Sequence, residues 1–325
     1  MINVAVIGTG GLGSQHAANF AQIADCRVKR VYDVVAENAK NCAEPLGAEV
    51  ASDPDQCLAD DIDAVVVVTP TDVHAEYCIR AAQAGKHIFC EKPMTRTLDE
   101  ADEVIETVEA AGVKMMVGHV LRFFPEYQTA RQMIKDGQLG EVGMIRMARI
   151  NLMPRGWFAD LQRSGGVILD MIIHDFDWLL WTLGPPERIY ARGLYEQLPA
   201  LDYALCTLRF PQGTVAFVEG SWADAGGFRT SFEITGSGGL LTHDSTESTT
   251  LIVQRRGGDG QVSEKAYLPM TPTAKSPYQT EEELFIAAVE NDHEPPITAR
   301  DGREAVRLAL AVLESAQTGH VIHYA

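Results

Sequence analysis

The chain of 325 residues is long enough for two domains, and its hydrophobic fraction of 46% is that of an ordinary globular protein with a sizeable core. Its 45 acidic residues outnumber its 27 basic ones, and the net charge of -18 argues against nucleic acid or an anionic membrane surface as a partner. We expect its 6 cysteines to be reduced, and the lack of a secretory leader or a membrane-spanning run predicts a cytoplasmic location.

The first expected element is a buried strand over Val4–Ile7 that leads directly into a glycine-rich turn and a helix over Gln15–Ile23. In this setting the glycines permit a tight turn and a close approach to a pyrophosphate, which the helix N-terminus stabilises. Out of this setting, such a turn usually binds nothing. The turn therefore predicts a dinucleotide site made by Gly8, Thr9, Gly10, Gly11, Leu12 and Gly13.

A second strand is expected over Val28–Tyr32, and Asp33 follows it, about 20 residues after Gly13. A carboxylate at this position accepts hydrogen bonds from the ribose hydroxyls of NAD and repels the 2′-phosphate of NADP. No basic residue follows at positions 34–36 to bind that phosphate. Asp33 therefore predicts NAD in preference to NADP.

Helices and strands continue to alternate up to residue 120, which predicts a doubly wound parallel sheet, a Rossmann domain, over residues 1–120. The expected elements are a helix at 36–44, a strand at 64–68, a helix at 74–84, a strand at 87–90, a helix at 98–110 and a strand at 114–117.

Ligands of such sheets bind at the carboxyl ends of the strands, so the residues after each strand are candidates for the site. Lys92 follows the strand expected at 87–90 and is expected near the nicotinamide, although a Glu-Lys-Pro turn alone is more often an exposed loop. The predicted cofactor contacts at these ends are Thr69, Pro70, Thr71, His74, Glu91 and Lys92.

Residues 121–325 are predicted to form a second α/β domain with an open, mainly antiparallel sheet that binds substrate and mediates oligomerisation. Strands are expected at 144–151, 189–194, 203–210, 214–221, 230–235 and 249–254, and two helices at 281–290 and 302–316 close the chain. An uncovered apolar sheet face is a candidate interface, so a homodimer or homotetramer is expected.

A mostly apolar helix is expected from Gly165 to Leu183. Asp170, His174 and Asp177 lie on one stripe of it and are expected to line a cleft, whereas Asp175 is expected to be a surface or packing charge. The alternative is an ordinary pair of polar residues on a helix surface.

Oxidation of a secondary alcohol needs a base, a donor to the developing oxyanion and a nicotinamide. His174, oriented by Asp170, suits the first task, and Lys92 suits the second. The sequence therefore predicts a catalytic set of Lys92, Asp170 and His174, with the ammonium and the imidazole facing the same ring.

The chain resembles the glucose-fructose oxidoreductase, inositol dehydrogenase and rhizopine-catabolism (Gfo/Idh/MocA) family. The resemblance covers essentially the whole chain and depends on the order and spacing of four motifs: Gly8-x-Gly10-x-x-Gly13, Glu91-Lys92-Pro93, Gly118-x-x-x-Arg122-Phe123 and Gly165-Gly166-x-x-x-Asp170-x-x-x-His174. It implies a Rossmann domain, a tightly held NAD or NADP, sugar, polyol or cyclitol substrates, and the same catalytic set.

Arg122, Trp157 and Tyr278 are candidate substrate-binding residues beside Lys92, Asp170 and His174. Inositol dehydrogenases tend to carry two basic residues where this chain has Leu121-Arg122, so the resemblance does not imply myo-inositol itself. The histidines show no metal-ligand spacing, and no metal is expected. A redox-neutral, NAD-dependent glycosidase using the same residues, and a regulator that senses NAD or sugar, remain alternatives.

Overall fold

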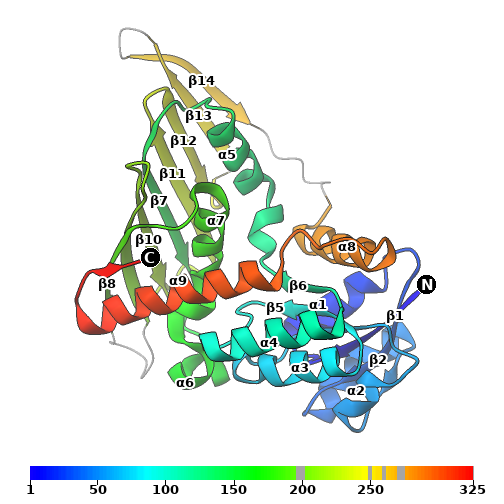
Figure 1. Cartoon of the computed structure of the whole chain (residues 1–325). Helices are drawn as coiled ribbons and strands as arrows, with labels where there is room; N and C mark the ends of the chain where they lie inside the picture. The colour runs from blue at the N-terminus through cyan, green and yellow to red at the C-terminus, as the bar shows by residue number, and fades with distance from the viewer. Residues whose placement is uncertain (195–201, 248–250, 258–260, 269–274, 325) are drawn as a thin grey trace. The chain divides into compact units, whose positions relative to one another are not determined.

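A computed structural model describes residues 1–194, 202–247, 251–257, 261–268 and 275–324. The chain forms two compact units (Figure 1). Unit 1 contains Met1–Val120 and Lys275–Val306, and unit 2 contains Leu121–Ala274 and Arg307–Ala325. The segment from Lys275 to Val306, which the sequence analysis places in the second domain, therefore packs with the first unit.

Unit 1 is built on a parallel sheet of six strands in the order β3-β2-β1-β4-β5-β6. This is the doubly wound sheet that the alternating pattern predicts, and the two-residue strand β3 is the one element of it that was not expected. The strands are β1 (Ile2–Ile7), β2 (Cys26–Tyr32), β3 (Glu49–Val50), β4 (Ala64–Val67), β5 (His87–Glu91) and β6 (Met115–Gly118).

Helices connect these strands, and the sequence caps α4 at both of its ends. Thr97 and Glu100 form a reciprocal capping box at the start of α4, and Gly112, with φ of 65°, ends that helix. The helices of unit 1 are α1 (Gly11–Phe20), α2 (Ala36–Leu46), η1 (Pro54–Leu58), η2 (Thr71–Val73), α3 (His74–Gln83), α4 (Leu98–Ala111) and α8 (Pro277–Glu290).

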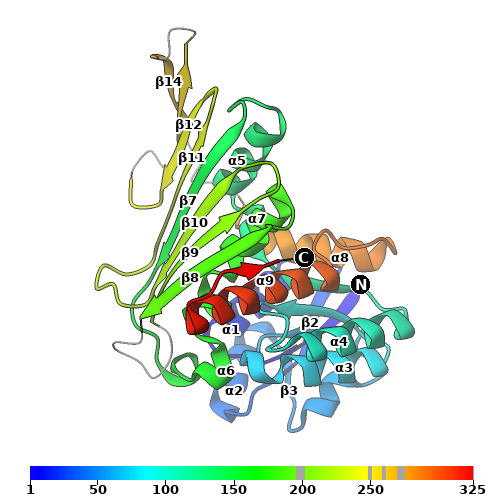
Figure 2. The same ribbon diagram turned by 60° about the vertical axis from the view of Figure 1, so that its left-hand side comes forward.

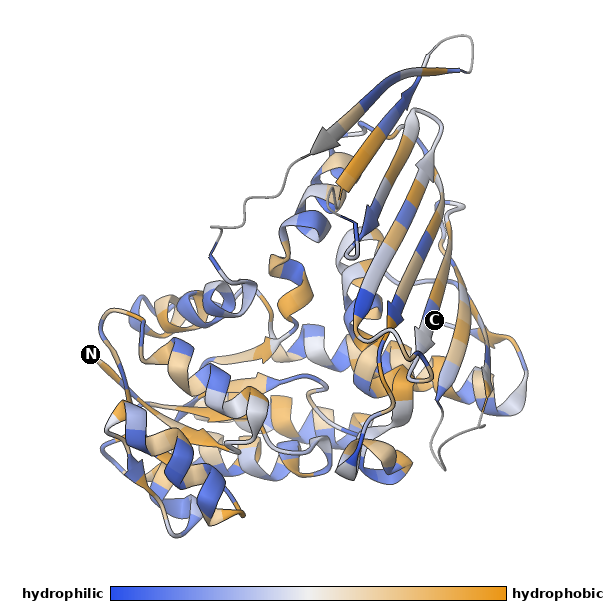
Figure 3. Ribbon diagram, turned by 180° about the vertical axis from the view of Figure 1, so that it is seen from behind, coloured by the Kyte–Doolittle hydropathy of each residue, from blue (hydrophilic) through white to orange (hydrophobic). Residues whose placement is uncertain are grey.

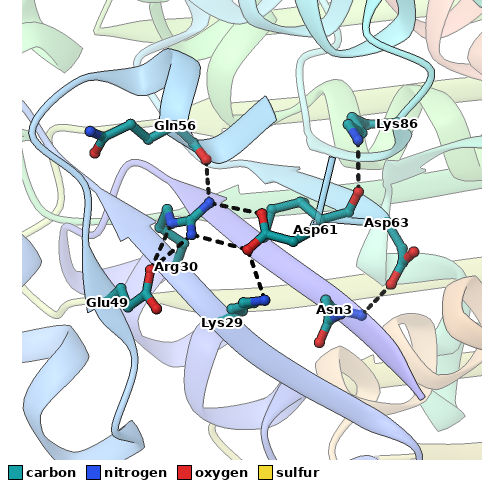
Figure 4. A network of polar contacts seen from close by, with 9 residues as sticks. Asn3, Lys29, Arg30, Glu49, Gln56, Asp61, Asp63 and Lys86 are labelled. Carbon is teal, nitrogen blue, oxygen red and sulfur yellow. Dashed lines mark hydrogen bonds and ion pairs between the residues drawn. The ribbon is translucent and has the colours of Figure 1, made fainter. Parts of the chain in front are cut away.

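A polar network ties β2 to its neighbours on one side of unit 1 (Figure 4). Arg30 contacts Glu49 on β3 at 2.8 Å, and Asp61 at 3.2 Å, and donates to the carbonyl oxygen of Gln56 at 2.6 Å. Hydrogen bonds from Lys29 and Arg30 lower the pKa of Asp61 to about 2. Since these charges face water, the network fixes the register of β2 and β3 more than it stabilises the fold.

The strand order reverses direction between β1 and β4, which are neighbours although β2 and β3 separate them in sequence. At such a switch point the connections leave on opposite faces of the sheet, and a crevice opens at the strands' carboxyl ends. Gly8 follows β1 there, and Thr69 lies just beyond the end of β4. The topology therefore brings together two of the predicted cofactor-binding segments.

Unit 2 contains a sheet of nine strands in the order β14-β13-β12-β11-β7-β10-β9-β8-β15 among the described residues. Only β7 and β10 pair in parallel there, so the expected open, mixed sheet is confirmed. The strands are β7 (Val142–Ile150), β8 (Arg188–Leu194), β9 (Tyr203–Arg209), β10 (Val215–Ser221), β11 (Arg229–Gly236), β12 (Gly239–Asp244), β13 (Leu251–Arg256), β14 (Val262–Leu268) and β15 (Ile322–His323).

β12, β14 and β15 were not expected, and positions 249–250 of the predicted strand at 249–254 lie outside the described residues. The helices of unit 2 are η3 (Val120–Phe123), α5 (Pro125–Lys135), η4 (Gly156–Ala159), α6 (Leu161–Ser164), η5 (Val167–Met171) and α7 (Ile173–Leu183). The division between the two units falls within α9 (Ala299–Thr318).

Side chains alternate between the two faces of the unit 2 sheet, and Figure 3 shows the alternation of hydrophobic and hydrophilic residues along its strands. On one face Cys206 and Val218 are fully buried, with α5 and α7 on that side (Figure 2). On the opposite face Tyr190 and Leu205 are exposed by 39% and 43%. The sheet therefore has one covered face and one open face that carries apolar side chains.

No helix within the described ranges has the length and the apolar character that crossing a lipid bilayer requires.

Candidate functional site

The glycine turn of unit 1 fits a dinucleotide cradle on its own geometry. Gly8 has φ of 90°, and a Cβ on Gly13 would fall on the carbonyl oxygen of Gly8, so both positions require glycine. In contrast, a Cβ on Gly10 or Gly11 would meet no atom within 4 Å. No side chain caps the N-terminus of α1, and its first N–H groups face the side where the strands end.

Asp33 is fixed at the end of β2 by the backbone around it. Its Oδ2 accepts from the Thr9 N–H at 2.7 Å, and its Oδ1 accepts from the Val35 N–H at 2.8 Å. Leu12 is 38% exposed on the same turn. The carboxylate predicted to bind ribose thus also holds the glycine turn in place.

The loop after β4 carries two hydroxyl groups that the described residues leave unsatisfied. The Oγ1 atoms of Thr69 and Thr71 are buried and have no hydrogen-bond partner there. Because buried polar atoms are normally paired, these two fit a polar ligand at this edge of the sheet. Pro70 lies between them.

His74 is buried and connects the loops after β4 and β5. One ring nitrogen lies 2.8 Å from the carbonyl oxygen of Thr69, and the other lies 2.8 Å from that of Pro93. Burial lowers the pKa of His74, although both carbonyl contacts oppose that shift. His74, predicted as a cofactor contact, therefore holds together the two loops from which the other candidates project.

Glu91, also predicted as a cofactor contact, directs its carboxylate into the interior and is 4% exposed. Its Oε1 lies 2.9 Å from Nε2 of His16, and its Oε2 accepts from the Lys92 N–H at 3.0 Å. The Lys92–Pro93 bond is cis, and Lys92 is partly exposed.

His16, expected from the sequence to be a packing residue, is completely buried on α1 between two carboxylates. Its Nδ1 lies 2.6 Å from Oε1 of Glu282 on α8. Burial lowers the pKa of His16, but hydrogen bonds to Glu282 and Glu91 outweigh it and raise the pKa to about 10. Sequence reasoning missed this contact because Glu282 is 266 residues away in the chain.

In unit 2 the predicted single helix at 165–183 is divided into the π-helical turn η5 and helix α7. A Cβ on Gly220 of β10 would meet Cγ2 of Ile172 at 2.6 Å, so glycine is needed for η5 to pack this closely on the sheet. Asp170 lies on η5 and is 8% exposed, and His174 lies in the first turn of α7. Segments of π-helix are frequent at functional sites.

Asp177, predicted to line a cleft, instead forms a buried ion pair. Its carboxylate accepts from Nε and Nη2 of Arg122 at 2.8 and 2.6 Å, and the two residues are 1% and 4% exposed. Of the two alternatives expected for Asp175, the packing charge is confirmed: its carboxylate is buried and accepts from Nε and Nη2 of Arg149 at 2.7 and 3.1 Å. These pairs hold α7 to η3 and to β7.

Replacing Arg122 with alanine is expected to lower the free energy of unfolding by about 3–5 kcal/mol, because the Asp177 carboxylate would stay buried without its partner. Urea unfolding measures this loss. The matched control is Arg209→Ala, whose half-exposed pair with Glu187 spans 3.9 Å and is worth at most about 1 kcal/mol. An Arg122 variant of unchanged stability but raised substrate KM would instead support the predicted contact with substrate.

The other two candidate substrate residues are aromatic and lie in different units. Trp157 on η4 stacks on Phe158 with 3.9 Å between ring centroids, and both rings are partly exposed. Tyr278 on α8 packs edge-on against His16 at 5.9 Å. Lys92 and Tyr278 thus belong to unit 1, whereas Trp157, Asp170 and His174 belong to unit 2.

Comparison with known proteins agrees with this description. Residues 2–119 match the oxidoreductase family with an NAD-binding Rossmann fold, and residues 127–242 match the GFO/IDH/MocA C-terminal domain. The myo-inositol 2-dehydrogenase of Thermotoga maritima is 30% identical over 323 residues, 97% of this chain and 96% of that protein. The inositol 2-dehydrogenase of Rhizobium meliloti is 32% identical over 322 residues, 97% of this chain and 96% of that protein.

Among solved structures, the scyllo-inositol dehydrogenase from Lactobacillus casei, crystallised with NAD(H) and scyllo-inositol, superposes with a TM-score of 0.83. The two sequences are 26% identical, and the match covers 99% of each chain. Both family models match, and the two inositol dehydrogenases align with 97% of the chain. The chain therefore belongs to the Gfo/Idh/MocA family and is an NAD-dependent dehydrogenase.

Proposed function

We propose that this dehydrogenase moves hydride between NAD and a secondary hydroxyl carbon of a cyclitol, or of a sugar or polyol that presents a similar ring of hydroxyl groups. The observation that carries the proposal is that two inositol dehydrogenases match 97% of the chain at 30% identity or more. Incubating the protein with a panel of cyclitols, aldoses and linear polyols, and following NADH absorbance with NAD or NADP, tests it. If no compound of the panel is oxidised with either cofactor, the proposal is contradicted.

The proposed roles follow from the chemistry of an alcohol. His174 takes the hydroxyl proton, Asp170 orients the imidazole and stabilises its charged form, and the Lys92 ammonium stabilises negative charge on the substrate oxygen. NAD, when bound, accepts the hydride. The partly exposed Trp157 suits the apolar C–H face of a ring, because aromatic side chains offer a flat apolar surface.

The proposed preference for NAD over NADP depends on Asp33. Replacing it with asparagine removes the negative charge and keeps a side chain of the same size, so we expect the ratio of kcat/KM with NAD to that with NADP to fall by roughly tenfold or more. Steady-state kinetics with both cofactors measure the ratio. Asp99→Asn, at an exposed position of α4, is the control, and an unchanged ratio in the Asp33 variant would refute the assignment.

We further propose a homodimer or homotetramer assembled on the open sheet face of unit 2, since contiguous exposed apolar side chains commonly mark interfaces. A shallow hollow on this face is lined by Leu205, Phe217 and Ile252, among others. Leu205→Glu is expected to shift sedimentation toward the monomer, because it would bury a charge in the interface. Leu284→Glu, a similarly exposed leucine on α8 of unit 1, is the control. A monomeric wild-type protein at micromolar concentration would refute this assembly.

The same assay, with an aryl glycoside added to the panel, addresses the redox-neutral glycosidase and the regulator. Turnover of an aryl glycoside without net NADH would favour the glycosidase, and tight NAD binding without reduction of any substrate would favour the regulator. The dehydrogenases among the relatives favour neither of them.

A further inference from the structure

The buried histidine of α1 lies among three carboxylates that come from two other elements, β5 and α8. Both ring nitrogens of His16 face carboxylate oxygens, which accept hydrogen bonds, so the doubly protonated ring satisfies both contacts. His16 is therefore the cation of this cluster, and Glu91 and Glu282 are its counter-ions.

Glu281 is the third carboxylate of the cluster, and neither of its oxygens has a hydrogen-bond partner among the described residues. One ligand atom each of His16, Glu91 and Glu281 lies within 4.8 Å of the others, a spacing that also occurs in metal sites. A metal is not favoured here, because both nitrogens of His16 are already bound to carboxylates. Burial raises the pKa of Glu281 well above its usual value, so a neutral carboxyl limits the buried charge.

Glu91 connects this cluster to the loop of the predicted catalytic lysine. One carboxylate oxygen binds His16 while the other accepts the backbone N–H of Lys92, so the orientation of the carboxylate sets where that loop begins. Burial raises the pKa of Glu91, but His16 and Lys92 outweigh this and keep the group ionised. A Cβ on Gly118 of β6 would lie 3.0 Å from Oε1 of Glu91, so the neighbouring strand leaves just enough room for the carboxylate.

We propose that His16 is a positioning residue for the reaction: it holds Glu91, and through Glu91 it fixes the backbone from which Lys92 projects. The helix whose first turn forms the predicted pyrophosphate cradle thereby also sets the position of the catalytic ammonium. The inference rests on the proposed role of Lys92.

Kinetics of His16→Gln test the inference, since glutamine keeps a donor but loses the fixed ring. We expect kcat to fall by roughly tenfold, as for a small misplacement of a catalytic group, with the Kd for NAD within about threefold of wild type. Asn19→Ala is the matched control: Asn19 lies on the same helix and donates to Glu282 at 3.2 Å. Its kcat is expected to stay within about twofold of wild type.

A mutant cycle then shows whether His16 acts through the lysine. In a Lys92→Ala background, His16→Gln should change residual single-turnover activity by less than about twofold, because the group that it positions is absent. If His16→Gln instead lowers activity by the same factor with and without Lys92, the inference is overturned. A metal bound stoichiometrically to the wild-type protein would also overturn it. Full activity of Lys92→Ala alone would instead overturn the proposed function, and the inference with it.

Gly118→Ala keeps the test decisive if His16→Gln does not fold. Its methyl group would displace the Glu91 carboxylate by a few tenths of an ångström without removing any hydrogen-bonding group. We expect kcat to fall severalfold, and this loss should also vanish in the Lys92→Ala background. Unchanged kcat in a folded Gly118→Ala protein would contradict the inference.

Discussion

Alanine at Lys92 or at His174 is expected to lower kcat by about two to four orders of magnitude, which is the contribution of a positioned acid, base or charge to such reactions. In the proposed mechanism the hydroxyl proton loses its acceptor when His174 is replaced, and the negative charge on the substrate oxygen loses its neighbouring cation when Lys92 is replaced. Stopped-flow measurement of NADH formation gives kcat, and calorimetric titration gives the Kd for NAD.

NAD should still bind to both variants, because the glycine turn and Asp33 are unchanged. Two substitutions serve as matched controls: Lys114→Ala, which removes a surface pair with Asp292, and His293→Ala, at an exposed position. Both should keep wild-type kcat. Full activity in the Lys92 or the His174 variant would remove that residue from the mechanism.

Two glycines of the cofactor turn should respond to alanine in different ways. At Gly13 the new methyl group would overlap the carbonyl of Gly8, so the turn must open, and we expect loss of NAD binding together with lower thermal stability. At Gly10 the methyl group meets no protein atom within 4 Å, so the protein without cofactor should keep its Tm.

Cofactor binding should nevertheless weaken by roughly tenfold or more in Gly10→Ala, because the pyrophosphate must approach this backbone closely. Thermal unfolding with and without NAD separates the two effects. Alanine at Gly143, where a Cβ also meets nothing within 4 Å, should change neither quantity. Tight NAD binding by Gly10→Ala would show that the cofactor does not lie over this turn.

The parallel sheet of unit 1 could be predicted from sequence because most of its strands are short, buried apolar runs and helical segments separate them. β3 is too short and too exposed to leave such a pattern. In unit 2 the sequence did not predict that the helix expected at 165–183 divides after Met171. A π-helical turn changes which residues share a face of the helix, but the residues on both sides of it are equally apolar.

Candidate site residues could be predicted only where a local motif marks them, as in the turn at Gly8 and the loop at Lys92. Contacts between distant segments leave no such motif. Nothing near Arg122 in sequence indicates Asp177, and nothing near His16 indicates Glu282, so both pairs needed the fold to be seen. Asp177 was wrongly predicted to line a cleft. Helical spacing predicts the face of the helix on which its side chain lies, but not that Arg122 packs against that face.

The return of residues 275–306 to the first unit affects how that unit can be made. Phe285 on α8 packs against Phe20 and Phe89, and Ile297 accepts a backbone hydrogen bond from Val117. A polypeptide emerging from the ribosome therefore carries an incomplete nucleotide-binding half until nearly all of its length has been translated. A fragment cut at residue 120 would expose Phe20 and Phe89 to water where Phe285 now covers them, and its recombinant expression alone should yield aggregates.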